Sequence, residues 1–95
     1  MSNTIFRDNS NYSDLLVGNV KRARAQISLV NQGEYEEALK VCQETIHQTV
    51  KYLYSIDGSN GGVGLRVQLK SAFKSEDSLH ELLNQLEMWG ADDGI

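Results

Sequence analysis

The stretch GEYEEALKVCQETI, Gly33–Ile46, predicts the start of a long helix and points to an all-helical fold. Gly33 is typical of the residue that ends a preceding helix, because glycine adopts the left-handed conformation there at no steric cost. Glu34, Glu36 and Glu37 fall in the first turn of the next helix, where the positive end of the helix dipole favours carboxylates. The stretch therefore indicates two helices joined by a short turn.

Apolar residues recur at spacings of three and four on both sides of this turn, which is the pattern of amphipathic helices. Before the turn, a helix with Ser13 as N-cap carries the stripe Leu16, Val20, Ala23, Ile27 and Val30. After it, the stripe comprises Tyr35, Ala38, Cys42, Ile46, Val50 and Leu53. The glycine-rich segment DGSNGGVG, Asp57–Gly64, is expected to end the second helix.

Two further helices are predicted beyond the glycines. A short third helix carries Leu65, Leu69, Ala72 and Phe73, and the polar segment KSEDS, residues 74–78, is expected to break the chain. Ser78 and Glu81 match a capping box, which predicts a fourth helix with the stripe Leu79, Leu82, Leu83, Leu86 and Trp89. The expected fold is an all-α, small antiparallel four-helix bundle with a short third helix. Its expected core includes Leu16, Ile27, Ile46, Leu53, Leu69, Leu83 and Leu86.

The length of 95 residues suits one domain. Residues 1–11 are polar and lack apolar periodicity, which predicts a flexible N-terminal arm. Residues 12–90 are expected to form the helical bundle domain, and residues 91–95 a C-terminal tail. Proline is absent from the chain, so no residue type forbids long helices.

The net charge of −4 makes nucleic acid an unexpected partner, since phosphate contacts require a surplus of Lys and Arg. The charge is uneven: residues 1–32 have a balance of +2 and the remainder a balance of −6. Lys21, Arg22 and Arg24 form a small basic patch, which suits a phosphate-bearing partner, an acidic protein or plain solvation. No run of about 18 apolar residues occurs and no signal peptide is recognisable, so we expect a cytoplasmic protein away from membranes.

No pattern of catalytic or metal-ligating residues is found. Cys42 lies on an apolar stripe, which predicts a buried small side chain rather than a reactive thiol, and a single cysteine fits a reducing compartment. His47 and His80 lack the spacing of a metal site. The segment GSNGGVG lacks the preceding strand and the Gly-Lys-Ser/Thr of a phosphate-binding loop. We expect no enzyme activity, no cofactor and no metal.

Some apolar residues lie off the expected core stripes, which indicates a binding surface for a protein partner or, alternatively, the edge of the core. The expected partner-binding residues are Val17, Val41, Tyr52, Tyr54 and Val67. Tyr52 and Tyr54 are about 200° apart on a helix, so only one can face the partner. We expect Tyr52 to be the exposed anchor and Tyr54 to pack inward. The sequence also leaves a homo-oligomer open.

The spacing from Gly18 to Gly62 resembles that of FliS, the flagellin export chaperones. The matching elements are LLVGNV (Leu15–Val20), GEYEEA (Gly33–Ala38), Ile56-Asp57 and Gly61-Gly62, and SEDSLHELLNQLEMW is similar to the last helix of that family. The chain departs from the family in a shorter third helix and a different N-terminal segment. The resemblance implies that a groove captures an amphipathic partner segment, with flagellin as the partner.

Two other families remain open. The Gly-x-Tyr-x-x-Ala start and SLHELL are also similar to HEPN-type helical domains, although no Arg is followed by a His at the spacing of their ribonuclease motif. A non-catalytic HEPN-like partner domain is therefore one alternative. Small size and acidic charge also suit an inhibitor or immunity-type protein that binds and blocks another protein. The Gly-x-Tyr-x-x-Ala pattern occurs once, so a tetratricopeptide array is not expected.

Overall fold

The structure is a computed structural model that describes residues 2–56 and 62–93, with side chains described for 12–56 and 62–89. The described residues form three helices and no strand: α1 is Ser2–Asn31, α2 is Tyr35–Ile56 and α3 is Val63–Asp93. The predicted all-α class is confirmed. The predicted number of four helices is wrong, because the expected third and fourth helices are one continuous helix.

The turn between α1 and α2 is the one that Gly33 predicts. Gly33 has a φ of 80°. Its N–H donates to the carbonyl of Val30 (3.0 Å), and the N–H of Glu34 donates to the carbonyl of Leu29 (2.8 Å). These two bonds form a Schellman motif, which satisfies carbonyls that the end of a helix would otherwise leave free.

The second connection joins α2 to α3 across a segment of which residues 57–61 lie outside the described residues. α2 ends at Ile56, directly before the glycine-rich segment, as the sequence predicts. Gly62 is buried, and a Cβ on it would stand 2.7 Å from the Leu53 Cδ2 atom. A side chain there would require the Leu53 side chain to shift, so the glycine suits the tight contact between the end of α2 and the start of α3.

The expected break at residues 74–78 is absent because the apolar stripe keeps its phase through this segment. Leu65, Ala72 and Leu79 are buried at intervals of seven residues, so one straight helix can bury all three against α2. Glu76 lies in the supposed break and accepts a hydrogen bond from Gln43 Nε2 on α2 (3.4 Å). Serine and aspartate disfavour a helix interior only by several tenths of a kcal/mol each, which this packing overrides.

The ends of the chain also differ from the expected boundaries. α1 begins at Ser2, so Ser13 is an interior residue of the helix rather than its N-cap. No glycine or proline occurs in residues 2–17, and nothing local therefore stops the helix from extending backward. Residues 2–11, the expected arm, are helical, and residues 91–93 of the expected tail belong to α3, while 94–95 lie outside the described residues. The mobility of both segments stays a prediction.

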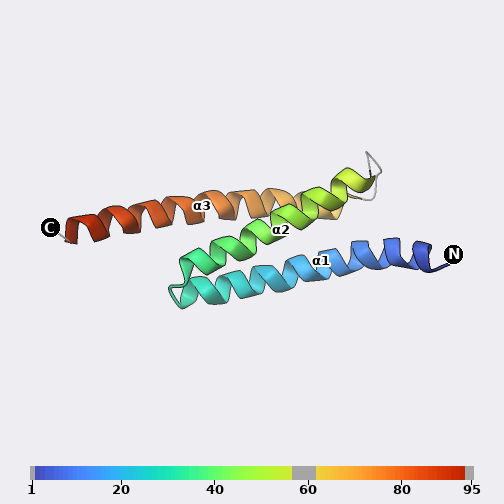
Figure 1. The fold of residues 1–95 in the computed structure, drawn as a ribbon, viewed down its shortest axis with the longest axis horizontal. Coiled ribbons are helices and arrows are strands. Elements are labelled where there is room, and N and C mark those ends of the chain that lie inside the picture. The colour runs from blue at the N-terminus through green and yellow to red at the C-terminus, as the bar shows by residue number, and fades with distance from the viewer. Residues whose placement is uncertain (1, 57–61, 94–95) are drawn as a thin grey trace.

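The three helices lie side by side with α2 in the middle (Figure 1). α2 packs against both α1 and α3, whereas α1 and α3 run in the same direction and barely touch each other. The C-terminal part of α3 extends past the turn between α1 and α2 (Figure 1). The molecule is therefore long and thin, with dimensions of 64 × 23 × 17 Å.

The core is a narrow line of mostly small side chains. Among the described residues, the buried ones are Asn19 on α1, Ala38, Cys42, Thr45 and Thr49 on α2, and Leu65, Ala72 and Leu79 on α3 besides Gly62. The expected burial of Ile27 is wrong, since 61% of its surface is exposed. The other expected core residues are half-buried: Leu16, Ile46, Leu53, Leu69, Leu83 and Leu86.

Candidate functional site

Polar side chains join all three helices at the centre of the molecule. Asn19 Nδ2 donates to Thr49 Oγ1 on α2 (3.1 Å) and to Gln68 Oε1 on α3 (2.8 Å). Arg22 Nε donates to Thr45 Oγ1 (2.8 Å), and its Nη2 donates to Asn19 Oδ1 (2.5 Å). Every buried polar side-chain atom in the described part of the chain has a partner, so the network carries no desolvation penalty for unpaired groups.

This network sets the rotation of α1 about its own axis. The residues of α1 that face α2 include Asn19 and Arg22, which lie one position before Val20 and Ala23 of the predicted apolar stripe. A shift of one residue rotates a helix by about 100°. The stripe consequently turns out of the core, and Val20 and Ile27 are 43% and 61% exposed.

The exposed stripe lines a groove between α1 and α3. One stretch of the groove has a volume of about 480 Å³, and an adjoining stretch of about 390 Å³ shares Gln26, Ser71 and Ser75 with it. α1 contributes Val20, Ala23 and Ile27 to the first stretch. α1 and α3 make few contacts with each other along this groove, since both pack mainly against α2.

Small side chains form the α3 side of the groove. They follow one another along the helix at spacings of one, three and three residues: Ser71, Ala72, Ser75 and Ser78. Val67 lies near one end of this row and Leu82 near the other. Small residues let another backbone approach closely. The α1 side of the groove therefore carries larger apolar side chains, and the α3 side consists mostly of small ones.

The structure does not bring the five expected partner-binding residues onto one surface. Val67 lines the groove and is 64% exposed. Val17 is exposed on α1, one turn before Val20. Val41 is half-buried one turn before Thr45, on the side of α2 that faces α1.

The exposure of the two tyrosines is the reverse of the one expected. Tyr52 is half-buried, and its ring centroid lies 6.0 Å from that of Tyr12 on α1. Tyr54 is 82% exposed. Tyr52 lies one turn after Thr49 and hence on the side of α2 that faces α1, whereas Tyr54 lies about 200° further round.

The basic patch is divided by the same network. Arg22 points into the interface between α1 and α2, where it bonds Thr45 and Asn19. Lys21 and Arg24 remain exposed, and Arg24 lines the groove. The solvent-facing patch therefore consists of two side chains rather than three.

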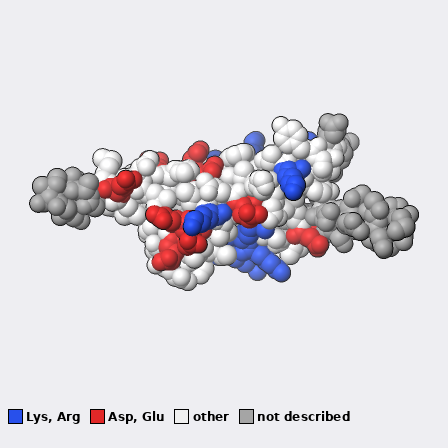
Figure 2. Space-filling model, viewed as in Figure 1, with Lys and Arg blue, Asp and Glu red and all other residues white. Residues whose placement is uncertain are grey.

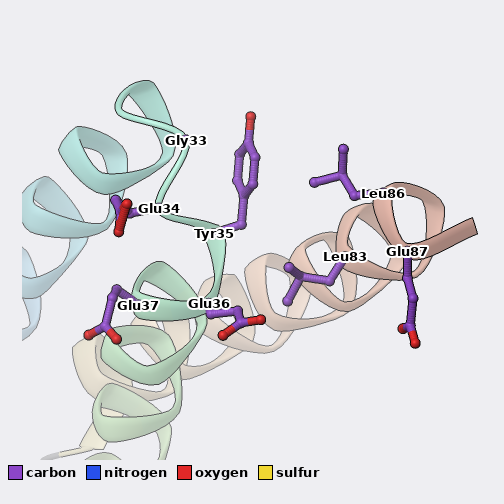
Figure 3. A pocket seen from close by; sticks show the side chains of 8 residues that line it. All are labelled: Gly33, Glu34, Tyr35, Glu36, Glu37, Leu83, Leu86 and Glu87. Atoms are coloured by element: carbon purple, nitrogen blue, oxygen red, sulfur yellow. The ribbon is translucent and has the colours of Figure 1, made fainter. Parts of the chain in front are cut away.

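A second pocket lies at the turn end, between the start of α2 and the part of α3 that extends past the turn. Tyr35, Leu83 and Leu86 line it, with Glu34, Glu36, Glu37 and Glu87 around them. Figure 3 shows the Tyr35 ring next to Leu86, while the carboxylates of Glu36, Glu37 and Glu87 point away from the ring. In the part of the chain that the structure describes, no group of three or more His, Cys, Asp or Glu residues could hold a metal ion.

The chemistry of Cys42 does not suit a nucleophile. The side chain is buried, and its Sγ donates to the carbonyl of Ala72 (3.1 Å). Burial, followed by the nearby negative charge of Glu76, raises the pKa of the thiol from 9.0 to about 11. The thiol is therefore protonated at neutral pH, and the reactive form of a cysteine is the thiolate.

The residues that the sequence interpretation missed as candidate binding residues are Val20, Ala23 and Ile27 on α1, which it assigned to the core, and Ser71 and Ser75 on α3. A second pattern in the sequence could have identified them. Asn19, Arg22 and Gln26 recur at the same helical spacing, one position before the apolar stripe. Thr45 and Thr49 on α2 offer the hydroxyls that such a polar stripe requires.

Within the described residues, no helix is long and apolar enough to cross a membrane. Comparison of the chain with protein families, with curated proteins and with solved structures gives no match.

Proposed function

We propose that this protein is a non-catalytic binding module whose α1–α3 groove captures an amphipathic helix of another protein. The observation that carries the proposal is the orientation of α1. This helix directs polar side chains at α2 and leaves Val20 and Ile27 exposed in the groove. Exposed apolar residues gathered along a groove are typical of a surface that a partner covers.

The shape of the groove favours a helix as the partner. α1 and α3 lie on either side of α2, and one more helix laid between them would complete a four-helix bundle. The small side chains of Ser71, Ala72 and Ser75 would let that helix approach α3 closely. Complete burial of one Val or Ile side chain contributes about 1.5–3 kcal/mol, so covering Val20, Ile27 and Val67 would contribute several kcal/mol at their present exposure.

The identity of the partner is proposed from the resemblance to FliS. A cytoplasmic chaperone of that kind would hold an amphipathic segment of flagellin in the groove and prevent its premature self-association. Flagellin is therefore the first partner to test. The half-buried position of Tyr52 makes it a poor probe of the site, and Ile27 and Val67 are better ones because both are exposed in the groove.

The test is a calorimetric titration of flagellin into the wild-type chain and three variants. Ile27→Asp and Val67→Asp place a carboxylate in the groove and should weaken binding by about 2 kcal/mol, or roughly thirtyfold, as hot-spot substitutions do. Tyr54→Asp adds the same charge on the outer face of α2 and should bind as the wild type does, because Tyr54 is 82% exposed away from the groove.

Thermal unfolding of each variant separates a loss of binding from a loss of folding. If Ile27→Asp and Val67→Asp fold normally and still bind flagellin with full affinity, the groove is not the binding site. If none of the proteins binds flagellin, the chaperone role is excluded.

A further inference from the structure

The segments of α1 and α3 that form the walls of the groove contain cations and no carboxylate. Residues 15–31 of α1 and 63–75 of α3 include six Lys or Arg side chains and no Asp or Glu, although the whole chain has 13 carboxylates. Among the described residues that line the groove, the charged ones are Arg24 on α1 and Lys74 on α3. On the face that Figure 2 shows, a group of cations lies over the middle of α1, whereas most carboxylates gather towards the turn end. The groove is therefore positively charged on a chain whose net charge is −4.

Both cations of the groove are accessible to a partner. The side chains of Arg24 and Lys74 are exposed. Neither forms a salt bridge with another described residue, since the ion pairs there join Lys40 to Glu37 and His80 to Glu76. Glu76 follows the groove wall in the sequence, but its carboxylate accepts a hydrogen bond from Gln43 on α2. Within the described part of the chain, the two cations thus have no carboxylate partner.

The two cations lie on opposite walls of the groove. Arg24 lines the stretch of about 480 Å³ and Lys74 the adjoining stretch of about 390 Å³, and the two stretches share Gln26, Ser71 and Ser75. A helix that lays its apolar stripe into the groove turns one flank towards each wall, as the e and g positions flank the a and d seam of a coiled coil. One flank of such a helix would therefore meet Arg24 and the other would meet Lys74.

We propose that the helix captured by the α1–α3 groove is acidic, with carboxylates on both flanks of its apolar stripe. This inference rests on the proposed capture of a partner helix and specifies the chemistry of that helix. Charges at the rim of an interface contribute more to the choice between partners than to affinity, and a helix with cationic flanks would place like charges opposite both walls. A nucleic acid would also meet the cations, but it has no apolar stripe to cover Val20, Ile27 and Val67.

Calorimetric titration with two synthetic helical peptides tests the proposal. Both peptides are about three heptads long with Leu at positions a and d, and they differ only in having Glu or Lys at positions e and g. At low ionic strength the Glu peptide should bind the full chain roughly tenfold more tightly than the Lys peptide. The net charge of −4 favours the opposite order, so the sign of the preference reports on the groove rather than on the whole chain.

Charge reversals in the groove should reverse this preference. Arg24→Glu and Lys74→Glu should each reduce the ratio of the two affinities, and the double variant should bind the Lys peptide more tightly. Lys51→Glu makes the same change in charge at an exposed residue that lines neither stretch of the groove, and it should alter the ratio much less. Because the ratio compares two peptides on the same protein, a change in the fraction of folded chain cancels. Added salt should bring the two affinities together, since it screens exposed charges.

The neutral variant Ile27→Asn separates a failure of this inference from a failure of the proposed function. If Ile27→Asn weakens both peptides but the wild type binds them equally or prefers the Lys peptide, the groove captures a helix that is not acidic. If neither peptide binds, or Ile27→Asn leaves binding unchanged, the groove is not a helix site and both proposals fail. A mixed-sequence RNA that displaces the Glu peptide and requires Arg24 and Lys74 would assign the groove to nucleic acid. A dimer of the free chain in sedimentation that Ile27→Asn disrupts would assign it to a second copy. Either result would overturn the inference.

Discussion

Two buried residues show how individual side chains define this structure. Asn19 bonds Thr49 on α2 and Gln68 on α3, and it thereby fixes the rotation and the height of α1. One buried asparagine can set the register of a helical bundle in this way, because any other register leaves its amide unpaired. Cys42 occupies the contact between α2 and α3, with its surface fully buried.

The buried thiol makes stability depend on pH in the alkaline range. The folded pKa of Cys42 is about 11, above its ordinary 9.0, so the unfolded chain loses the thiol proton first. The stabilisation from keeping the thiol neutral is complete below pH 9 and is lost as the pH rises from 9 to 11. Two pKa units correspond to about 3 kcal/mol.

Urea unfolding of the wild type and of Cys42→Ala at several pH values measures this effect. The alanine variant should be less stable at neutral pH because of the cavity it leaves. The difference should shrink between pH 9 and pH 11, since only the wild type has the thiol. Tyrosines that ionise in the same range are common to both proteins and cancel. A stability difference that stays constant over this range would mean that the thiol is not shielded from water in the folded chain.

At the scale of elements, α3 is the helix whose continuity matters most, because it supplies one whole side of the groove. The capping box at Ser78 and Glu81 predicts a helix start there, whereas the structure has Ser78 exposed in the interior of α3. The two arrangements assign opposite roles to the Ser78 hydroxyl. An N-cap hydroxyl satisfies a free backbone donor, but an interior serine only weakens the helix.

Ser78→Ala therefore changes stability in opposite directions in the two cases. In a continuous α3 the substitution should stabilise the fold by roughly 0.5 kcal/mol, because alanine is the better helix former. At an N-cap it would destabilise the fold by about 1 kcal/mol. Ser13→Ala makes the same comparison on α1, where Ser13 is also exposed within a helix. Denaturant midpoints decide the sign, and a loss of stability in Ser78→Ala would contradict a continuous α3.

The sequence predicts the elements that depend on local chemistry. Gly33 and the acidic first turn of α2 identify the first turn correctly, because a Schellman motif is a local arrangement. Whether the chain breaks at residues 74–78 cannot be decided from those residues alone. The helix continues through them because Ala72 and Leu79 are both buried against α2 on the same face of α3. The rotation of α1 depends on hydroxyls and an amide from two other helices. For this reason the apolar pattern of α1 alone predicts Val20, Ala23 and Ile27 in the core, whereas the structure places them in the groove.

At the scale of the whole molecule, an open three-helix arrangement leaves two features that a closed bundle would lack. The first is the α1–α3 groove with its exposed apolar edge. The second is a thin, elongated shape. The proposed capture of a partner helix therefore depends on the groove being open in the free chain.

Solvent paramagnetic relaxation of methyl groups by NMR tests most directly whether the groove is open in the free chain. The chain is kept dilute enough to be monomeric by sedimentation, and a soluble paramagnetic agent is added before and after flagellin. We predict strong relaxation of the Val20, Ile27 and Val67 methyls in the free monomer and a marked loss of it with flagellin. The methyls of the fully buried Leu65 should relax weakly in both states. If the Val20, Ile27 and Val67 methyls are already as protected as those of Leu65 in the free monomer, α1 packs its apolar stripe inward and the groove does not exist.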